Sequence, residues 1–211
     1  MNILNERVSQ IRSSISDGRA DLVRDSRRKI VNAAARLFRQ KGFHKTAIRD
    51  ISVEMGVSQG HIYQYISRKE DILLLMLEMA VDDYHEKLFC LLDQDLDDET
   101  RLIRAIEVYY GIINRHRDKT SVLYFHTSSL EPEDRKLFDL AERDVTMFFQ
   151  SVIGRGVTSG AFKTDNPFLV AFDVVSLGHM WALKHHRFKG VMTLGDYITA
   201  QTEYVLRMVR D

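Results

Sequence analysis

The stretch from residue 46 to residue 70 contains the feature that most restricts how this chain can fold. Its pattern predicts two short helices, Ala47 to Met55 and Ser58 to Tyr65, joined by a turn of only a few residues. Gly56 can adopt the left-handed backbone that such a turn requires, and the small side chain of Ser52 lets the helices approach closely. Two short helices at this spacing are typical of a helix-turn-helix unit.

Longer amphipathic helices are predicted on both sides of this unit. Residues Asp25 to Lys41 carry an apolar stripe at helical spacing, and Gly42 follows as a helix C-cap. Downstream, Ser67 at the N-cap and Glu70 three positions later form the pattern of a capping box, which predicts a long helix through Leu92. The unit is therefore expected to lie between helices that can build a small core around it.

The rest of the chain also has helical periodicity, and no segment alternates convincingly as a strand would. Pro132 and Pro167, the only two prolines, are both placed near the first turn of an expected helix, where proline is tolerated. The predicted fold is therefore all-α. The further helices are expected near residues 99–116, 119–129, 132–158, 166–187 and 193–210.

Charge is distributed unevenly, although the net charge of the whole chain is zero. From residue 19 to residue 71 there are 12 Lys and Arg against 6 Asp and Glu, whereas from residue 72 to residue 211 there are 16 against 22. A basic head on an acidic body fits a DNA-binding module attached to a body with another task. We expect an N-terminal extension at residues 1–24, a DNA-binding domain at 25–72 and a second domain at 73–211.

Composition excludes several classes of protein. Cys90 is the only cysteine, so no internal disulfide and no cysteine-rich zinc site can form, which fits a reducing cytoplasm. The longest apolar runs, such as Ile72 to Leu77, are far shorter than the roughly 20 residues that cross a bilayer. Residues 1–8 lack the apolar block of a signal peptide, and no His-Glu-x-x-His motif occurs. We therefore expect a cytoplasmic protein with no metal, no other cofactor and no membrane partner.

An ordered series of residues makes the helix-turn-helix assignment more specific. The residues are Leu37-Phe38, Gly42-Phe43, Thr46, Ile51, Gly56-Val57-Ser58, Ile62-Tyr63, Tyr65 and Lys69-Glu70-Asp71. Through them the chain resembles the TetR family of transcriptional regulators over about residues 27–77. It departs from the family pattern at Ile66, where phenylalanine is usual, and at Arg68, where serine or threonine is common.

The resemblance implies both an architecture and a function. The architecture is an N-terminal three-helix helix-turn-helix DNA-binding domain followed by a C-terminal helical domain for ligand binding and dimerisation. The expected partners are a double-stranded DNA operator, a small-molecule effector and a second copy of the chain. The family default is a repressor that a small apolar effector releases from a palindromic operator. An acyl-CoA or another bulky ligand suits the aromatic body, and the sequence leaves repressor and activator open.

The second short helix is expected to enter the major groove of DNA. Its residues that face away from Ile62 can read bases, because glutamine pairs with adenine and histidine can donate to guanine. Tyrosine hydroxyls suit phosphates, and the resemblance places Thr46, Arg49 and Lys69 on phosphates. For Thr46 and Ser58, helix capping alone is an equally good explanation. The expected DNA-binding residues are Thr46, Arg49, Ser58, Gln59, Gly60, His61, Tyr63, Gln64, Tyr65 and Lys69.

The second domain is rich in aromatic residues and methionine, and most of these are expected to be ordinary core. The candidates for lining an effector pocket are Tyr110, His126, Phe148, Asp173 and Trp181. The last two helices can form a four-helix interface between two copies, or can simply pack within one chain. The candidates for dimerisation are Val174, Leu177, Gly178, Tyr197, Gln201 and Tyr204.

The basic run from Lys184 to Lys189 has two interpretations. It can hold the anionic head group of an effector, or it is a solvated helix C-terminus, where cations are favoured. Two other functions compete with a regulator. An enzyme is one, although no phosphate-binding glycine loop or nucleophile motif occurs, and we expect none. The other is an architectural or protein-interaction module, which would bind DNA without sequence preference.

Overall fold

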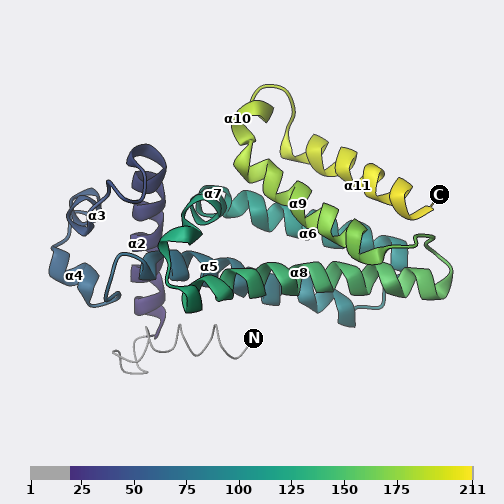
Figure 1. The fold of residues 1–211 in the computed structure, drawn as a ribbon, viewed down its shortest axis with the longest axis horizontal. Coiled ribbons are helices and arrows are strands. Elements are labelled where there is room, and N and C mark those ends of the chain that lie inside the picture. Colours follow the sequence, from purple (N-terminus) through teal and green to yellow (C-terminus); the bar gives the residue numbers. More distant parts are fainter. Residues whose placement is uncertain (1–19, 211) are drawn as a thin grey trace. The chain divides into compact units, whose positions relative to one another are not determined.

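The structure is a computed structural model that describes residues 20–210, so most of the expected N-terminal extension lies outside the described residues. Within them every regular element is a helix and no strand occurs, which confirms the all-α prediction (Figure 1). No helix in this range is long and apolar enough to span a membrane. The chain divides into two compact units.

The first unit extends to Met79 and also includes Asp118–Phe138. Its elements are α2 (Ala20–Lys41), α3 (Ile48–Met55), α4 (Gln59–Tyr63), the first part of α5 (Asp71–Asp83), α7 (Arg117–His126), η4 (Thr127–Ser129) and the start of α8 (Pro132–Ser159). The domain boundary expected after residue 72 stays a prediction, because the first compact unit contains residues from both sides of it.

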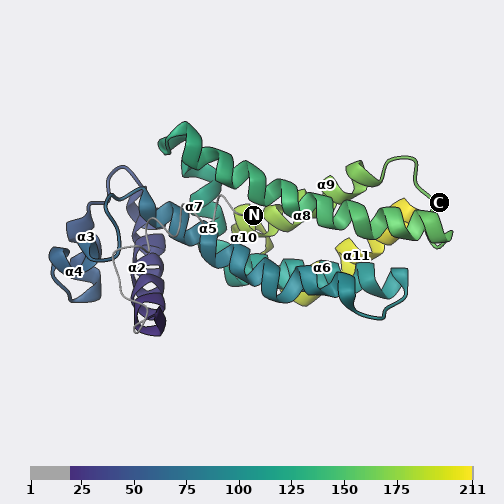
Figure 2. The ribbon, with the colours of Figure 1, turned by 90° about the horizontal axis from the view of Figure 1, so that it is seen from below.

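The second unit consists of Ala80–Arg117 and the chain from Asp139 onward. Three of its helices, α6, α9 and α11, lie side by side in both ribbon views (Figure 1 and Figure 2). Besides the ends of α5 and α8, its elements are the π-helix η2 (Tyr84–Leu88), the 3-10 helix η3 (Phe89–Asp93), α6 (Asp98–Arg115), α9 (Pro167–Leu183), α10 (His185–Phe188) and α11 (Leu194–Arg210).

The core of the first unit is built from the apolar stripes of its helices. Ile30 and Phe38 of α2, Ile51 of α3 and Ile62 of α4 are all buried. Phe43, directly after α2, packs edge to face on Phe38 with 4.9 Å between the ring centroids. Because burial of one such side chain stabilises a fold by about 1.5–3 kcal/mol, this small set can hold the head together.

Aromatic packing of α6 on α9 forms the core of the second unit. Tyr109 and Tyr110 of α6 are fully buried, and their rings lie against Gly178 of α9. A Cβ atom at residue 178 would come within 2.6 Å of the Tyr109 ring, so the glycine permits this close approach. Tyr109 also packs on Phe149 of α8, with 5.5 Å between the centroids. The three helices therefore meet around one tyrosine.

The start of α5 differs from the prediction. The capping box expected from Ser67 and Glu70 does not form, because the helix begins later, at Asp71. The carboxylate of Asp71 accepts hydrogen bonds from the backbone N–H groups of Ser67 at 2.8 Å and Arg68 at 3.0 Å. The Asp71 side chain therefore accepts from the Ser67 N–H, the donor that the Glu70 side chain was expected to satisfy in a capping box.

The end of α5 also differs from the prediction of one helix through residue 92. The α-helix gives way to η2 at Tyr84 and to η3 at Phe89. Arg101 of α6 is buried and donates hydrogen bonds to the carbonyl of Gln94 at 2.8 Å and to that of Leu96 at 2.9 Å. It also donates to the carbonyl of Leu91. This side chain satisfies carbonyl groups that would otherwise lack partners at the helix end.

Candidate nucleic-acid interface

The turn between α3 and α4 has the geometry that its sequence predicted. Gly56 ends α3 with a φ angle of +67°, a left-handed conformation that favours glycine. The backbone N–H groups of Gly56 and Val57 donate to the carbonyls of Val53 and Ser52, at 3.1 and 2.9 Å. Ser52 is buried, so its small side chain allows the two helices to pack closely.

Helix α4 is capped at its start and anchored on one face only. The Ser58 Oγ atom accepts a hydrogen bond from the backbone N–H of His61 at 3.1 Å, which makes Ser58 the N-cap. Ile62 is buried in the core of the first unit. The expected contact residues that lie exposed on this helix and just after it are Gln59, Gly60, Tyr63 and Gln64. The exposed face of α4 thus carries polar side chains, while its buried face packs on the core of the first unit.

Two other expected contact residues are less accessible. His61 and Tyr65 are half-buried, and their rings pack edge to face with 5.2 Å between the centroids. This packing restricts both side chains before any ligand binds. Restriction in the free protein lowers the entropic cost of ordering a side chain in a complex.

Thr46 has a different place from the one expected. The N-cap of α3 is Ala47, whose backbone N–H donates to the carboxylate of Asp50 at 2.9 Å. Thr46 is only 1% exposed, and its hydroxyl donates to the carbonyl of Gly42 at 2.8 Å. Its side chain joins the end of α2 to the start of α3. The expected roles of Thr46 as an N-cap and as a phosphate ligand are therefore revised to a structural one.

Lys69 is tied to the same loop. Its Nζ atom donates to the carbonyls of Phe43 at 2.8 Å and Thr46 at 3.1 Å, and it lies 4.3 Å from the centroid of the Phe43 ring. The cation over the ring face adds an attractive interaction. Because an ammonium group has three donors, one N–H of Lys69 has no acceptor among the residues that the structure describes.

Arg49 of α3 is exposed, and no carboxylate among the described residues forms an ion pair with it. Two nearby basic side chains already form ion pairs with carboxylates. Arg36 pairs with Glu54 at 3.0 Å, and Lys41 lies 3.7 Å from Asp50. Arg49 therefore keeps its donors for a ligand at the surface of the helix-turn-helix unit.

Three of the effector candidates are packed inside the second unit. Tyr110, Phe148 and Trp181 are all buried. The Tyr110 hydroxyl donates to the carbonyl of Val174 at 3.1 Å, and the Trp181 Nε1–H donates to Asn114 Oδ1 at 2.9 Å. The polar atoms of these two side chains are thus committed to the fold, and only their rings are available to an apolar ligand.

The other two effector candidates lie elsewhere. Asp173 is half-buried on α9. His126 belongs to the first unit, where its ring centroid lies 5.7 Å from that of Phe43 and 6.2 Å from that of His44. Burial, followed by the positive charges of His44 and Lys69, lowers the pKa of His126. The structure therefore does not bring His126 into the unit that holds the other four candidates.

The dimerisation candidates divide into core and surface residues. The core residues, whose side chains pack within one chain, are Val174, Gly178 and Tyr197. Leu177 and Gln201 are half-buried, and Tyr204 of α11 is 66% exposed. An interface between copies would therefore use neighbouring positions on α9 in place of the three core residues.

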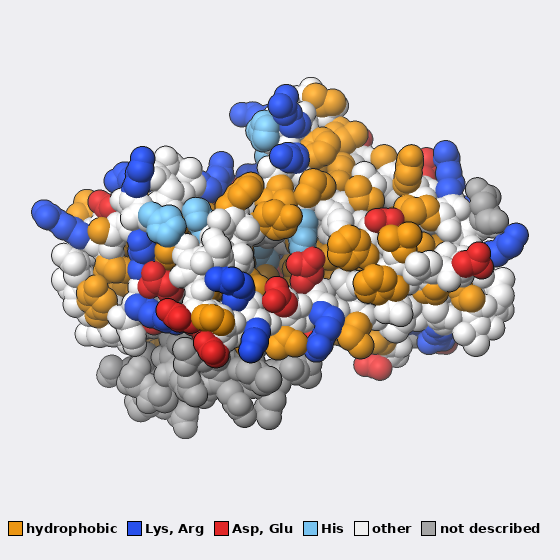
Figure 3. Space-filling view, in the orientation of Figure 1, with side chains coloured by type: hydrophobic (Ala, Val, Ile, Leu, Met, Phe, Trp, Pro, Cys, Tyr) orange, Lys and Arg blue, Asp and Glu red, His pale blue; other side chains and the backbone are white. Residues whose placement is uncertain are grey.

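Those neighbouring positions were missed by the sequence analysis. Phe168, Leu169 and Phe172 of α9 are 53%, 51% and 45% exposed. Figure 3 shows hydrophobic side chains gathered over α9 and α11. The signal in the sequence was that Asp173 is the only Asp, Glu, Lys or Arg residue of α9. A helix that is apolar on all sides is expected to be covered on more than one face.

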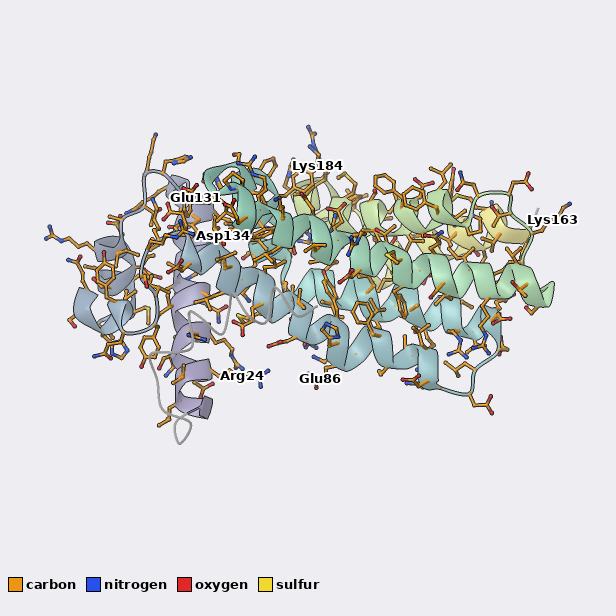
Figure 4. All side chains as sticks on the ribbon, turned by 60° about the horizontal axis from the view of Figure 1, so that its bottom comes forward. Arg24, Glu86, Glu131, Asp134, Lys163 and Lys184 are labelled. Atoms are coloured by element: carbon orange, nitrogen blue, oxygen red, sulfur yellow. The ribbon has the colours of Figure 1, made fainter. Side chains whose placement is uncertain are left out.

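The basic run around α10 is at the surface. Lys184 points away from the ribbon in Figure 4, and Arg187 and Lys189 are also exposed. His185 is half-buried, with Nε2 2.8 Å from Nη1 of Arg117. No group of three or more metal-ligating side chains able to hold an ion occurs among residues 20–210.

A helix-turn-helix head with an exposed second helix, joined to an all-helical body, defines a class of DNA-binding regulators. Residues 30–76 match the family model of bacterial regulatory proteins of the tetR family. Residues 95–209 match the model of the tetracyclin repressor-like C-terminal domain. The chain belongs to the TetR family of DNA-binding transcriptional regulators.

Individual relatives agree with this assignment. The transcriptional regulator HbdR of Aromatoleum sp. (strain CIB) is 32% identical over 189 residues, which cover 89% of this chain and 81% of HbdR. The repressor KstR2 of Rhodococcus jostii (strain RHA1) is 24% identical over 80% of this chain and 83% of its own length.

Two solved structures share the fold. The regulator PfmR from Thermus thermophilus has a TM-score of 0.76 at 24% identity, and the match covers 84% of this chain and 97% of PfmR. AibR in complex with isovaleryl coenzyme A and operator DNA has a TM-score of 0.71 at 18% identity, over 85% of this chain and 97% of AibR.

Proposed function

We propose that this protein is a repressor that binds a palindromic operator as a homodimer and is released by a bulky apolar effector such as an acyl-CoA. The observation that carries the proposal is the exposed polar surface of α4 on a capped, buried helix-turn-helix core. Gln59 and Gln64 can make paired hydrogen bonds with adenine, and His61 can donate to guanine. Gly60 lets the backbone approach the DNA closely.

Phosphate contacts would fix the register of the head on the duplex. Arg49 and the remaining N–H of Lys69 supply positive charge. The Ser58 oxygen accepts a hydrogen bond from the backbone, so its O–H is free to donate. The hydroxyls of Tyr63 and Tyr65 are further donors. These contacts add affinity for any sequence, whereas the side chains of α4 add preference for one sequence.

The proposed dimer joins the exposed apolar surfaces of α9 and α11 in two copies. Phe168, Leu169 and Phe172, together with Tyr204, form an apolar surface of the kind that marks an interaction site. Two helices from each copy can form a four-helix interface around a two-fold axis. Two α4 helices held in this way would match half-sites roughly 34–36 Å apart.

The effector class is supported by the relatives and by the chemistry of the second unit. AibR is described with isovaleryl coenzyme A and operator DNA, and KstR2 is named a repressor. The buried aromatic residues of the second unit suit an apolar acyl group. The exposed cations at Lys184, Arg187 and Lys189 suit the phosphates of coenzyme A.

Release of the operator would follow from thermodynamic linkage between effector binding and operator binding. An effector that binds more tightly to the conformation with mismatched half-site spacing must weaken operator binding by the same factor. An effector that binds both conformations equally would have no effect, however tightly it bound.

The test begins with enrichment of a randomised duplex library on the purified protein, followed by sequencing. We expect a palindromic consensus. Titration of the labelled consensus with isovaleryl-CoA, benzoyl-CoA and decanoyl-CoA should then show at least one ligand that weakens binding ten-fold or more. No enrichment at low salt by folded dimer would reject sequence-specific binding. Equal operator affinity of the free and ligand-saturated protein would reject induction.

A further inference from the structure

Most polar groups in the aromatic interior of the second unit are already hydrogen-bonded within the fold. The hydroxyl of Tyr109 donates to the carbonyl of Val175 at 3.4 Å, and that of Tyr197 donates to the carbonyl of Leu177 at 2.7 Å. The Tyr110 hydroxyl and the Trp181 indole are engaged in the same way. Such groups hold α9 in place and have little capacity left for a ligand.

Two polar side chains beside Tyr109 are different. Tyr84 and His179 make no hydrogen bond to any residue in the described range 20–210. Their ring centroids lie 5.9 Å and 6.4 Å from that of Tyr109, so each of the two rings is a neighbour of Tyr109. Tyr84 is buried and His179 is half-buried. Polar atoms that have no partner within the described fold keep their donors and acceptors for a ligand.

The backbone at Tyr84 is also unusual. It is the first residue of the five-residue π-helix η2, which buries Tyr84 and Leu88. Glu86, from the same segment, is exposed (Figure 4). π-Helical turns are rare and frequently occur at functional sites. In η2 the wider turn accompanies a tyrosine whose hydroxyl forms no hydrogen bond with the part of the chain that the structure describes.

Both side chains are neutral at pH 7. Burial lowers the pKa of His179 to about 4. Burial, followed by the negative charges of Glu142 and Asp83, raises the pKa of Tyr84 above its ordinary value. A neutral imidazole offers one donor and one acceptor, and a phenol offers a donor. The pair can therefore bind an uncharged oxygen but brings no positive charge to balance an anion.

We infer that Tyr84 and His179 form the polar anchor of the effector site and hydrogen-bond an uncharged carbonyl oxygen, such as that of a thioester. This inference rests on the proposed function and specifies the chemistry of its effector. A free carboxylic acid is disfavoured at this position, because an ionised carboxylate buried without a cation is costly. The negative charge of Glu142, which acts on the Tyr84 hydroxyl, adds repulsion. The anchor thus distinguishes an activated acyl group from the corresponding free acid.

The test is calorimetric binding to the full-length protein. The probes are isovaleryl-CoA, benzoyl-CoA and decanoyl-CoA, together with isovalerate, benzoate and decanoate. For the best thioester we expect binding at least ten-fold tighter than for its acid. Tyr84→Phe and His179→Leu should each weaken that thioester about ten-fold and leave its acid and the operator affinity unchanged. His179→Gln, which keeps a donor and an acceptor, should recover part of the loss.

Tyr109→Phe is the matched control, because it removes a hydroxyl that is already engaged with Val175. It should bind the thioester as the unaltered protein does, and thermal unfolding of every variant checks folding. Acids that bind as tightly as thioesters, no binding of any thioester, or unaltered binding by Tyr84→Phe and His179→Leu would each overturn the inference. Operator binding, measured in parallel, tests the proposed function separately, since it does not depend on which ligand occupies the anchor.

Discussion

At the scale of single residues, a few side chains determine how closely the helices pack and how the head meets DNA. Gly178 is one of them, because its missing Cβ leaves room for two tyrosine rings. Lys69 is another, because its ammonium group joins the loop after α2 to the start of α5. For each of these two residues, a single substitution can test the role that the structure gives it.

Gly178→Ala should destabilise the second unit by about 1–3 kcal/mol, the usual cost of overpacking a core. The added Cβ would lie 2.6 Å from the Tyr109 ring and 3.0 Å from the Tyr110 ring. Urea denaturation measures the change. Gly111→Ala is the control, since no atom lies within 4 Å of its added Cβ. There alanine should raise stability by up to about 1 kcal/mol, because glycine disfavours helix. Equal effects at both sites would contradict the packing argument.

Lys69→Gln should weaken DNA binding for every sequence and lower the slope of log affinity against log salt by about 1, as expected for one lost phosphate contact. Fluorescence anisotropy over a range of salt concentrations measures this slope. Gln64→Ala should instead change base preference and leave the slope as it is. Should Lys69→Gln alter preference without altering the slope, Lys69 would not be a phosphate ligand.

At the scale of elements, an ion-pair cluster joins the start of α5 to the start of α8. Arg68 donates from Nε to Asp71 Oδ1 at 3.2 Å and from Nη2 to Asp134 Oδ2. Asp134 is fully buried on the first turn of α8, where it is labelled in Figure 4. Arg68 is also one of the two positions where the chain departs from the family pattern. The departure therefore supplies a partner for a buried carboxylate.

Arg68→Ser should destabilise the protein by about 2–3 kcal/mol, because it removes charge-assisted hydrogen bonds to two carboxylates, one of which is fully buried. Arg36→Ser is the control. Its pair with Glu54 has side chains that are 53% and 39% exposed, and exposed pairs contribute about 0–1 kcal/mol. Chemical denaturation of both variants gives the comparison. A loss at Arg68 no larger than that at Arg36 would show that the buried pair contributes no more than an exposed one.

At the scale of the whole molecule, the proposed dimer depends on the apolar surface of α9 and α11. Phe172→Asp should convert the proposed dimer to monomers, because it places a charge in that apolar surface, where a second copy would cover it without a compensating partner. Light scattering after size-exclusion chromatography measures the mass, and operator affinity should fall with it. Val191→Asp, at a residue that is 76% exposed outside both helices, should leave the dimer intact. A dimeric Phe172→Asp protein would place the interface elsewhere.

The stability of the whole molecule should also depend on the protonation of His179. Its pKa is about 4 in the folded chain and about 6.5 in an unfolded chain. Between these values the unfolded state binds the extra proton, so stability falls as pH decreases from 6.5 towards 4. The loss is about 2–3 kcal/mol for this group. The stability of the unaltered protein relative to that of His179→Leu should fall by this amount as pH decreases over the range, and a difference that does not change with pH would contradict the assignment.

The sequence by itself determined the features that depend on neighbours along the chain. The all-α fold and the turn at Gly56 follow from helical periodicity, and the N-cap at Ser58 follows from its place before α4. These signals are local, because a cap or a turn is satisfied within a few residues. The ordered series of residues in the head was also sufficient to indicate the TetR family.

The tertiary structure decided what depends on partners distant in sequence. Thr46 does not cap α3, because its hydroxyl donates to a carbonyl just after α2. The helix expected through Leu92 changes to a π-helix at Tyr84, and Arg101 binds carbonyl groups where the chain leaves the helical segment. The buried Val174 and the exposed Phe172 are equally apolar, so helix composition could not assign one to the core and the other to the surface. Only packing against α6 separates them, because burial is a property of the neighbours that a side chain meets and not of the side chain alone.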